Sequence, residues 1–193
     1  MKRAVFFDRD GVVNELVPDP VSGLPESPLD SDEVELIPGA ASALRRLRSA
    51  GYVRVGISNQ PAAAKGVVSL DDLERVQARV LDLLAREGVT PEAFRLCFHH
   101  PDGVVVELAR TCDCRKPASG MLLDAAEELG LDLGRSWLVG DTDDDVAAGA
   151  AAGCRTVLLD NPSSAHKRGG AARADAHAPD LAAAAELILR STR

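Results

Sequence analysis

Residues 2–11 read KRAVFFDRDG, and this stretch decides the fold. Residues 2–7 form a short run rich in apolar side chains, which predicts a buried β-strand. Two carboxylates, Asp8 and Asp10, follow at once, and Gly11 permits a sharp turn after them. Because ligands of parallel α/β sheets bind beyond the carboxyl ends of the strands, this acidic turn predicts a functional site.

The rest of the chain alternates apolar runs with amphipathic stretches, as α/β proteins do. The remaining predicted strands span residues 53–57, 136–139 and 156–159, and the predicted helices span residues 40–50, 70–87, 121–129, 144–152 and 180–190. Ser69 is placed to cap the second of these helices. The pattern predicts a three-layer, Rossmann-like α/β fold with a mainly parallel sheet and helices on both faces.

Length and composition limit the function classes. The chain has 193 residues, of which 46% are hydrophobic and 27% are charged, as expected for one globular domain. The net charge of −8 and the 3% aromatic content argue against a nucleic-acid partner. The sequence predicts neither a membrane span nor a signal peptide, so we expect a cytoplasmic protein. In the absence of a heptad seam, we expect a monomer.

Polar side chains follow the other predicted strands as well. Ser58 and Asn59 follow the second strand, Arg115 and Lys116 precede a helix, and an acidic run that contains Asp141 and Asp145 follows a later strand. Each group alone is typical of a helix cap or a turn. Together they bring carboxylates, a hydroxyl, an amide and two cations to one rim, where a divalent cation would relieve the repulsion. Hard oxygen ligands beside a phosphate indicate Mg²⁺.

These motifs, in the order D-x-D-G, S, K and D-x-x-x-D, resemble those of the haloacid dehalogenase (HAD) superfamily of phosphotransferases. The resemblance implies that Asp8 attacks phosphorus and forms an aspartyl-phosphate. It implies that Asp10 acts as general acid and then as general base. Ser58 and Lys116 would bind the transferring phosphoryl oxygens, and Asn59 belongs to the same substrate-binding group.

The same resemblance implies a catalytic Mg²⁺ site. Its ligands would be the side chains of Asp8 and Asp141 and the backbone carbonyl of Asp10, with Asp145 in support. These oxygen donors suit a cation that also keeps water and phosphate as ligands.

A second metal site is predicted in the segment 97–117. Cys97, His99, Cys112 and Cys114 form two ligand pairs with a spacing that suits a closed tetrahedral zinc site. With every position filled by protein, the Zn²⁺ would be structural and would fix the neighbouring Arg115 and Lys116. The alternatives are four unconnected residues or a Cys112–Cys114 redox pair.

Within the superfamily, CxH…CxCRKP together with DRDG and SNQ resembles the small, cap-less heptose-bisphosphate phosphatases. That resemblance implies a single domain over residues 1–193 without a separate cap, carrying a Pro-rich loop at 15–37 and a zinc loop at 97–117. It implies removal of the 7-phosphate from D-glycero-D-manno-heptose 1,7-bisphosphate, with Arg115 on the second phosphate or a hydroxyl. The chain departs from the family pattern at residues 15–18 and 61–66, which would border the sugar.

Two other readings remain open from the sequence. One is a histidinol-phosphate phosphatase, or another small phosphomonoester phosphatase, with the same chemistry. The other is a receiver-like domain that accepts a phosphate on an aspartate without acting as an enzyme. The second carboxylate of the D-x-D pair, Asp10, argues against the receiver, because it supplies a means to cleave the acyl-phosphate.

Overall fold

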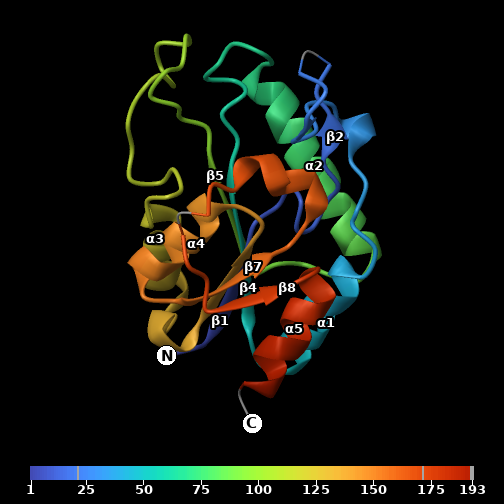
Figure 1. Ribbon diagram of the computed structural model, residues 1–193, viewed down its shortest axis with the longest axis vertical. Helices are drawn as coiled ribbons and strands as arrows, with labels where there is room; N and C mark the ends of the chain where they lie inside the picture. Colours follow the sequence, from blue (N-terminus) through green and yellow to red (C-terminus); the bar gives the residue numbers. More distant parts are fainter. Residues whose placement is uncertain (21, 171, 192–193) are drawn as a thin grey trace.

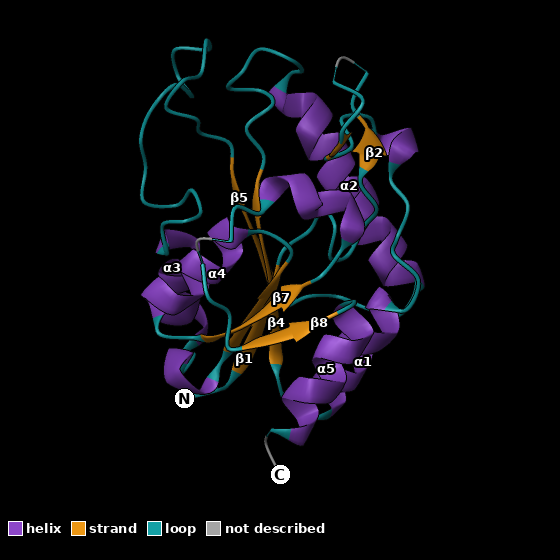
Figure 2. Ribbon diagram, in the orientation of Figure 1, coloured by secondary structure: helices purple, strands orange, loops and turns teal. Residues whose placement is uncertain are grey.

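The computed structural model describes residues 1–20, 22–170 and 172–191, and its fold is the expected α/β architecture. A six-stranded sheet with the order β5-β4-β1-β6-β7-β8 forms the centre, and every neighbouring pair is parallel (Figures 1 and 2). The strands are β1 (Ala4–Phe7), β4 (Val53–Asn59), β5 (Ala93–Cys97), β6 (Trp137–Gly140), β7 (Arg155–Leu159) and β8 (Ala176–Ala178). The motif-bearing strand β1 lies in the middle of this sheet.

Helices cover both faces of the sheet because the central strands are apolar on both sides. Along β1, Val5 and Phe7 belong to one core cluster, whereas Ala4 and Phe6 belong to the other. The first cluster is completed by α1 (Ala40–Ser49), α2 (Leu70–Arg86) and α5 (Leu181–Arg190), and the second by α3 (Gly120–Leu129) and α4 (Asp143–Ala152). Figure 1 shows α3 and α4 on the opposite side of the sheet from α1 and α5. The three-layer prediction is therefore confirmed.

The four predicted strands and the five predicted helices are present, with ends that differ by one or two residues. The predicted Ser69 cap is also confirmed, since its side chain accepts a hydrogen bond from the backbone N–H of Asp72. Two strands of the six-stranded sheet were missed. The edge strand β5 carries Arg95 at its centre and runs into the Cys/His segment, so it lacks an apolar signature, and β8 has only three residues.

The segment 15–37 was expected to be a loop, and this expectation was partly wrong. It contains a two-stranded antiparallel pair and a short 3-10 helix: β2 (Val17–Pro18), β3 (Pro25–Glu26) and η1 (Ser31–Glu33). No strand pattern is visible in the sequence here, because each strand has only two residues and the segment is rich in proline. Glu26 forms an ion pair of 2.6 Å with Lys167 at the end of η3 (Pro162–Lys167), which ties the segment to the opposite side of the site.

The long connections gather at one end of the sheet. The chain between β4 and α2, the chain between β5 and α3, and the segment 15–37 all extend beyond the same edge, away from both termini (Figure 1). This end of the sheet is formed by the carboxyl ends of the parallel strands, where the predicted site residues begin. No helix in the described part of the chain is long and apolar enough to span a bilayer.

Candidate active site and metal centre

Asp8 lies directly after β1 and is buried, with 8% of its surface exposed. Its backbone N–H donates to the carbonyl of Val139 in β6, which holds the turn against the sheet. Its Oδ1 lies 3.0 Å from Nζ of Lys116. Burial raises the pKa of Asp8 to about 6; the carboxylates of Asp145 and Asp10 add to this, and Lys116 opposes it. The structure therefore holds a carboxylate against an ammonium at the end of the central strand.

Lys116 joins two carboxylates that are far apart in the sequence. Its Nζ lies 2.5 Å from Oδ1 of Asp145 as well as 3.0 Å from Asp8. Burial alone would lower the pKa of Lys116, but these two carboxylates raise it above its ordinary value. The side chain of Asn59 pairs with the backbone of Lys116: Nδ2 donates to its carbonyl at 2.9 Å, and Oδ1 accepts from its N–H at 3.0 Å. Asn59, expected near the substrate, thus holds Lys116 in place.

Asp8, Asp141 and Asp145 form one buried cluster whose ligand atoms lie within 4.8 Å of one another. If all three carboxylates were ionised, the ammonium of Lys116 would offset one negative charge, and two would remain on the cluster. Oδ1 of Asp141 is buried without a hydrogen-bond partner among the described residues. Burial, together with Asp8 and Asp145, raises the pKa of Asp141 to about 8. A hard divalent cation suits this donor set, because it would satisfy the free oxygen and neutralise the excess charge.

Asp145 differs from the other two acids in its partners. Its Oδ1 faces Lys116, and its Oδ2 accepts from the backbone N–H of Thr142 at 3.1 Å and from its hydroxyl at 2.6 Å. These contacts form the capping box at the start of α4. They fix the carboxylate of Asp145, which in turn contacts Lys116. Both oxygens of Asp145 are thus engaged, so its contribution is to orient Lys116.

Asp10 points into a different set of partners. Its Oδ1 accepts from Nε of Arg9 at 3.0 Å and from Nδ2 of Asn14 at 2.9 Å. Its Oδ2 accepts from Nη2 of Arg9 at 3.1 Å and from Nε2 of Gln60 at 2.6 Å. Burial raises the pKa of Asp10, but Arg9 and the hydrogen bonds from Arg9, Asn14 and Gln60 outweigh it, so the net shift is downward.

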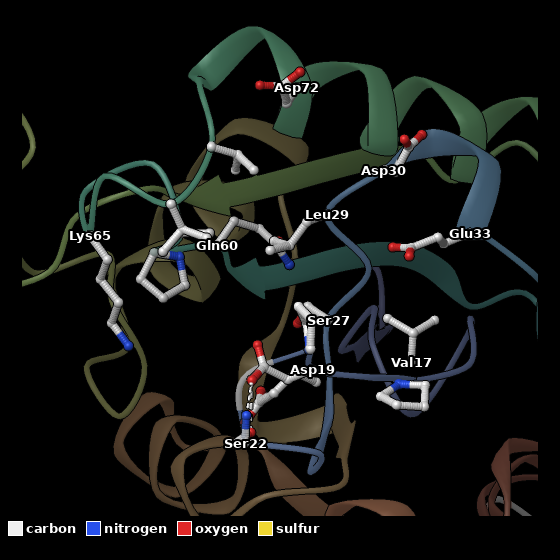
Figure 3. Close-up of a pocket in the computed structure, with 17 residues that line it drawn as sticks. Val17, Asp19, Ser22, Ser27, Leu29, Asp30, Glu33, Gln60, Lys65 and Asp72 are labelled. Carbon is white, nitrogen blue, oxygen red and sulfur yellow. Dashed lines mark hydrogen bonds between the residues drawn. The ribbon is translucent and has the colours of Figure 1, made fainter.

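A cavity of about 300 Å³ opens over these groups. Its lining includes Asp8, Asp10, Ser58, Asn59, Arg115, Lys116 and Asp141, and also Lys65 from the stretch 61–66 that was expected to border the sugar. The unpredicted residues of the lining are Glu26, Ser27, Asp144 and Lys167. A larger cavity of about 620 Å³ adjoins it and shares Glu26, Ser27, Pro61 and Lys65 with it. Figure 3 shows this outer cavity between the segment 15–37 and the chain that follows β4. The sequence-predicted phosphate ligands therefore face one connected space.

Several residues that support the acidic turns were missed in the sequence. Asn161 donates from Nδ2 to the carbonyl of Gly11 at 2.9 Å, and Ser164 donates to the carbonyl of Asp141 at 3.2 Å. Both come from the chain after β7, whose polar composition resembles that of any surface loop. The position of this segment could have indicated its role, because it also follows the carboxyl end of a parallel strand.

The four predicted zinc ligands come together. Sγ of Cys97, Cys112 and Cys114 and Nδ1 of His99 lie within 4.8 Å of one another. The separations from Sγ of Cys114 are 3.1 Å to Cys97, 3.2 Å to Cys112 and 3.4 Å to His99 Nδ1. A tetrahedral zinc–thiolate site with bonds of about 2.3 Å has edges of about 3.8 Å, so a modest expansion would accept the ion.

The protonation tendencies of these side chains fit a metal site too. Burial and the nearby Arg110 guanidinium lower the pKa of His99, which leaves its ring neutral with a lone pair for a metal. Burial and the two neighbouring thiols raise the pKa of Cys114, because three thiolates repel one another without a cation between them. All four cysteines are free, so the four-residue cluster fits Zn²⁺ better than a disulfide. Cys154, which is outside this cluster, is buried in the core.

The cluster is connected through the backbone to the residues that were predicted to bind phosphate. Cys97 ends β5, and its carbonyl accepts from the N–H of Gln60 at 2.7 Å. Cys114 precedes Arg115 and Lys116, and Nη1 of Arg115 donates to the carbonyl of His99 at 3.4 Å. The cysteine and histidine side chains thus anchor both ends of the loop that carries the two cations.

The fold, the buried aspartate pair after β1 and the lysine that faces it define a HAD-type phosphatase, and comparisons with known proteins agree. The HAD-hydrolase-like family model matches residues 113–184. A D-glycero-β-D-manno-heptose-1,7-bisphosphate 7-phosphatase of Yersinia pestis is 36% identical over 156 residues, covering 81% of this chain and 79% of the relative. A protein of the same name from Rhodopseudomonas palustris is 38% identical over 150 residues, covering 78% and 79%.

Solved structures give the same result. The D,D-heptose 1,7-bisphosphate phosphatase of B. bronchiseptica, complexed with magnesium and phosphate, superimposes with a TM-score of 0.80 at 31% identity, covering 98% of this chain and 99% of that one. The enzyme of the same name from Burkholderia thailandensis gives a TM-score of 0.67 at 25% identity, covering 97% and 99%. The chain belongs to the D-glycero-β-D-manno-heptose-1,7-bisphosphate 7-phosphatase family of the HAD superfamily.

Gly11→Ala should disturb the acidic turn selectively. Gly11 has a φ of 78°, and a Cβ there would overlap Oδ2 of Asp141. We expect a loss of roughly 1–3 kcal/mol in unfolding free energy, together with loss of activity, because both the backbone and Asp141 must shift. The matched control is Gly130→Ala, where φ is 65° but a Cβ meets nothing within 4 Å. It should cost only about 1 kcal/mol and keep kcat. Equal effects on kcat would contradict the geometry.

Proposed function

We propose that the protein removes the 7-phosphate of D-glycero-β-D-manno-heptose 1,7-bisphosphate through an aspartyl-phosphate intermediate. The observation that carries this proposal is the buried Asp8 carboxylate, held 3.0 Å from Lys116 in a cavity that further cations line. The relatives of known name act on that heptose bisphosphate. The cavity supplies a nucleophile, a phosphate-binding ammonium and a second acid in one place.

In the first step, a carboxylate oxygen of Asp8 attacks phosphorus and the bond from phosphorus to the sugar oxygen breaks. Asp10, whose hydrogen bonds favour the carboxylate, must first take up a proton, which it then gives to that leaving oxygen. Ser58 and Lys116 bind the phosphoryl oxygens as negative charge develops. In the second step, Asp10 takes a proton from water, which attacks the aspartyl-phosphate and releases inorganic phosphate. Asp8 is thereby returned to its starting form.

Mg²⁺ fits the acidic side of this site. The carboxylates of Asp8 and Asp141 and the backbone carbonyl of Asp10 would hold it, and when bound it offsets the repulsion between nucleophile and phosphate. The free Oδ1 of Asp141 and the excess negative charge of the cluster support this assignment. Asp145 supports it indirectly by orienting Lys116.

The second phosphate of the substrate has a cationic region available. Lys65, Arg115 and Lys167 line the catalytic cavity. Lys167 is paired with Glu26 at 2.6 Å, so Lys65 and Arg115 are the cations offered to the second phosphate. Arg115 suits a phosphate because its planar guanidinium can donate two parallel hydrogen bonds. Figure 3 shows the side chain of Lys65 beside the outer cavity. We infer that these cations select a doubly phosphorylated sugar.

We further propose that residues 1–193 form one hydrolase domain without a cap. In place of the cap, the segments 15–37 and 97–117 would shape the pocket, the first held by the Glu26–Lys167 ion pair and the second by zinc. We also propose that the protein is a monomer and that it works in the cytoplasm. A reducing compartment of that kind keeps thiolate ligands available for zinc.

Phosphate release from a panel of sugar phosphates tests the substrate. With Mg²⁺ present, we expect kcat/KM for D-glycero-β-D-manno-heptose 1,7-bisphosphate to exceed that for the 7-monophosphate and for histidinol phosphate by at least about tenfold. Each lost phosphate contact is worth roughly 1.5–3 kcal/mol. Arg115→Gln should narrow the preference for the bisphosphate over the 7-monophosphate. A preference for histidinol phosphate would replace the proposed substrate and retain the chemistry.

Asp8→Asn should abolish turnover, because an amide cannot form the acyl-phosphate. We expect kcat to fall by at least about 10³-fold while the fold is retained. Asp124→Asn, an exposed carboxylate on α3, is the matched control and should behave like the native chain. Retention of more than a few per cent of activity by the Asp8 variant would refute the nucleophile assignment, and full activity in excess EDTA would refute the Mg²⁺ assignment.

The zinc assignment predicts about one Zn²⁺ per chain by elemental analysis. Cys112→Ser should lower the zinc content and reduce phosphate affinity, because Arg115 and Lys116 lose their anchor. Cys154→Ala is the control, since that thiol lies in the core outside the cluster. A native chain purified without chelators that contains no zinc, or a Cys112 variant with full zinc and full activity, would contradict the site.

A further inference from the structure

Gln60 lies where three parts of the site meet. It follows β4 directly and is buried, with 2% of its surface exposed. Its backbone N–H donates to the carbonyl of Cys97 at 2.7 Å. Its side-chain Nε2 donates to Oδ2 of Asp10 at 2.6 Å and to Oγ of Ser58 at 3.0 Å. One amide therefore connects the general acid/base with a phosphate-binding hydroxyl.

The orientation of this amide is determined by its surroundings. A reversed amide would place the Gln60 oxygen 2.6 Å from an oxygen of Asp10, and an ionised carboxylate only accepts hydrogen bonds. Two acceptors at that distance repel, so the nitrogen must face Asp10. A primary amide has two N–H groups, and here Asp10 and Ser58 take both of them.

The contact with Ser58 determines what that hydroxyl can offer. A serine hydroxyl has one proton and can also accept hydrogen bonds. Because Gln60 donates to Ser58 Oγ, the hydroxyl proton stays available for another acceptor. A phosphoryl group of the substrate is such an acceptor, and Ser58 lines the catalytic cavity. Gln60 thereby keeps Ser58 in its donor orientation toward the substrate.

The contact with Asp10 differs from those of Arg9 and Asn14 in where its donor lies. Arg9 and Asn14 hold the carboxylate from the protein interior, where both are fully buried, and Gln77 in turn accepts from Nη1 of Arg9 at 3.2 Å. Gln60 instead lines the outer cavity, as Figure 3 shows, and donates to the Oδ2 of Asp10 that also accepts from Nη2 of Arg9. Without Gln60, the Asp10 carboxylate would lose a hydrogen bond that comes from a residue of the cavity lining.

We propose that Gln60 is a positioning residue of phosphoryl transfer, whose side-chain amide aims Asp10 and the Ser58 hydroxyl at the same substrate. The inference rests on the aspartyl-phosphate chemistry proposed above, but not on the identity of the sugar. Gln60 touches neither phosphorus nor the leaving oxygen. It fixes Asp10, whose carboxyl group, once protonated, gives its proton to the leaving oxygen as the bond from Asp8 to phosphorus forms.

A purely structural role for Gln60 predicts a different effect of substituting its side chain. The link from Gln60 to the zinc loop uses its backbone N–H, which every residue except proline supplies. Substitution of the side chain therefore leaves that link intact and removes only the contacts with Asp10 and Ser58. The two roles can be separated experimentally.

The test is Gln60→Met, which keeps an unbranched side chain of similar length and removes both donors. Release of the leaving group is followed in single turnovers, with enzyme in excess, for the heptose 1,7-bisphosphate and for p-nitrophenyl phosphate. The sugar alkoxide needs a proton from Asp10, whereas p-nitrophenolate leaves without one. We expect the rate with the heptose to fall about 100-fold and the rate with the aryl phosphate to fall less than about tenfold.

Two further variants keep the outcome decisive. Thr156→Val removes a buried hydroxyl that bonds Asp175 at 3.0 Å, away from the site, and should leave both rates unchanged. If the methionine variant does not fold, Gln60→Glu places a carboxylate against Asp10 and should show the same dependence on the leaving group. Equal losses with both substrates, or native rates, would overturn the positioning role. A native chain that cleaves neither phosphate would overturn the proposed function, and the role of Gln60 with it.

Discussion

The structure of the site depends on one buried ammonium shared by two carboxylates. Lys116 lies between Asp8 and Asp145, and all three are almost fully removed from water. Buried charges are costly unless they are paired in good geometry, so each member of this group requires the others. The strand β1 supplies Asp8, the start of α4 supplies Asp145, and the loop after β5 must return to supply the lysine. The positions of three distant segments follow from this one requirement.

The requirement explains why so much of the surrounding structure serves Lys116. Asn59 pairs with both its backbone groups, and Thr142 fixes the carboxylate of Asp145 that it contacts. The cysteine and histidine cluster holds the loop that carries the lysine, two residues from Cys114. A lysine on an unsupported loop of this length would lose conformational entropy whenever it met phosphate. Fixing the loop beforehand moves that cost from substrate binding to folding.

The two acids after β1, Asp8 and Asp10, have different surroundings, although they are only two residues apart. Asp8 lies among other carboxylates and one ammonium, and its pKa is raised to about 6. Asp10 accepts from Arg9, Asn14 and Gln60, and its pKa is lowered. Alternation along a strand would place residues two apart on the same face, so the bend after Asp8 and the turn at Gly11 place the two carboxylates in these separate surroundings. A nucleophile and a proton-transfer group need different neighbours, and the short D-x-D-G stretch supplies them.

The sequence by itself determined the architecture and most of the chemistry. Apolar β1, the acidic turn after it and the alternation of strands and helices are local signals, so the parallel sheet and its functional edge could be predicted. The Cys/His spacing likewise predicted the cluster that the structure brings together. Local signals failed for β5 and β8, because an edge strand with a central arginine and a three-residue strand carry no clear apolar period. Only the tertiary structure decided that Asn59 holds Lys116, that Asp145 orients it, and that Gln60 joins Asp10 to Ser58. Such contacts join residues as far as 57 positions apart, and their geometry depends on how whole elements pack rather than on the pattern of any one segment.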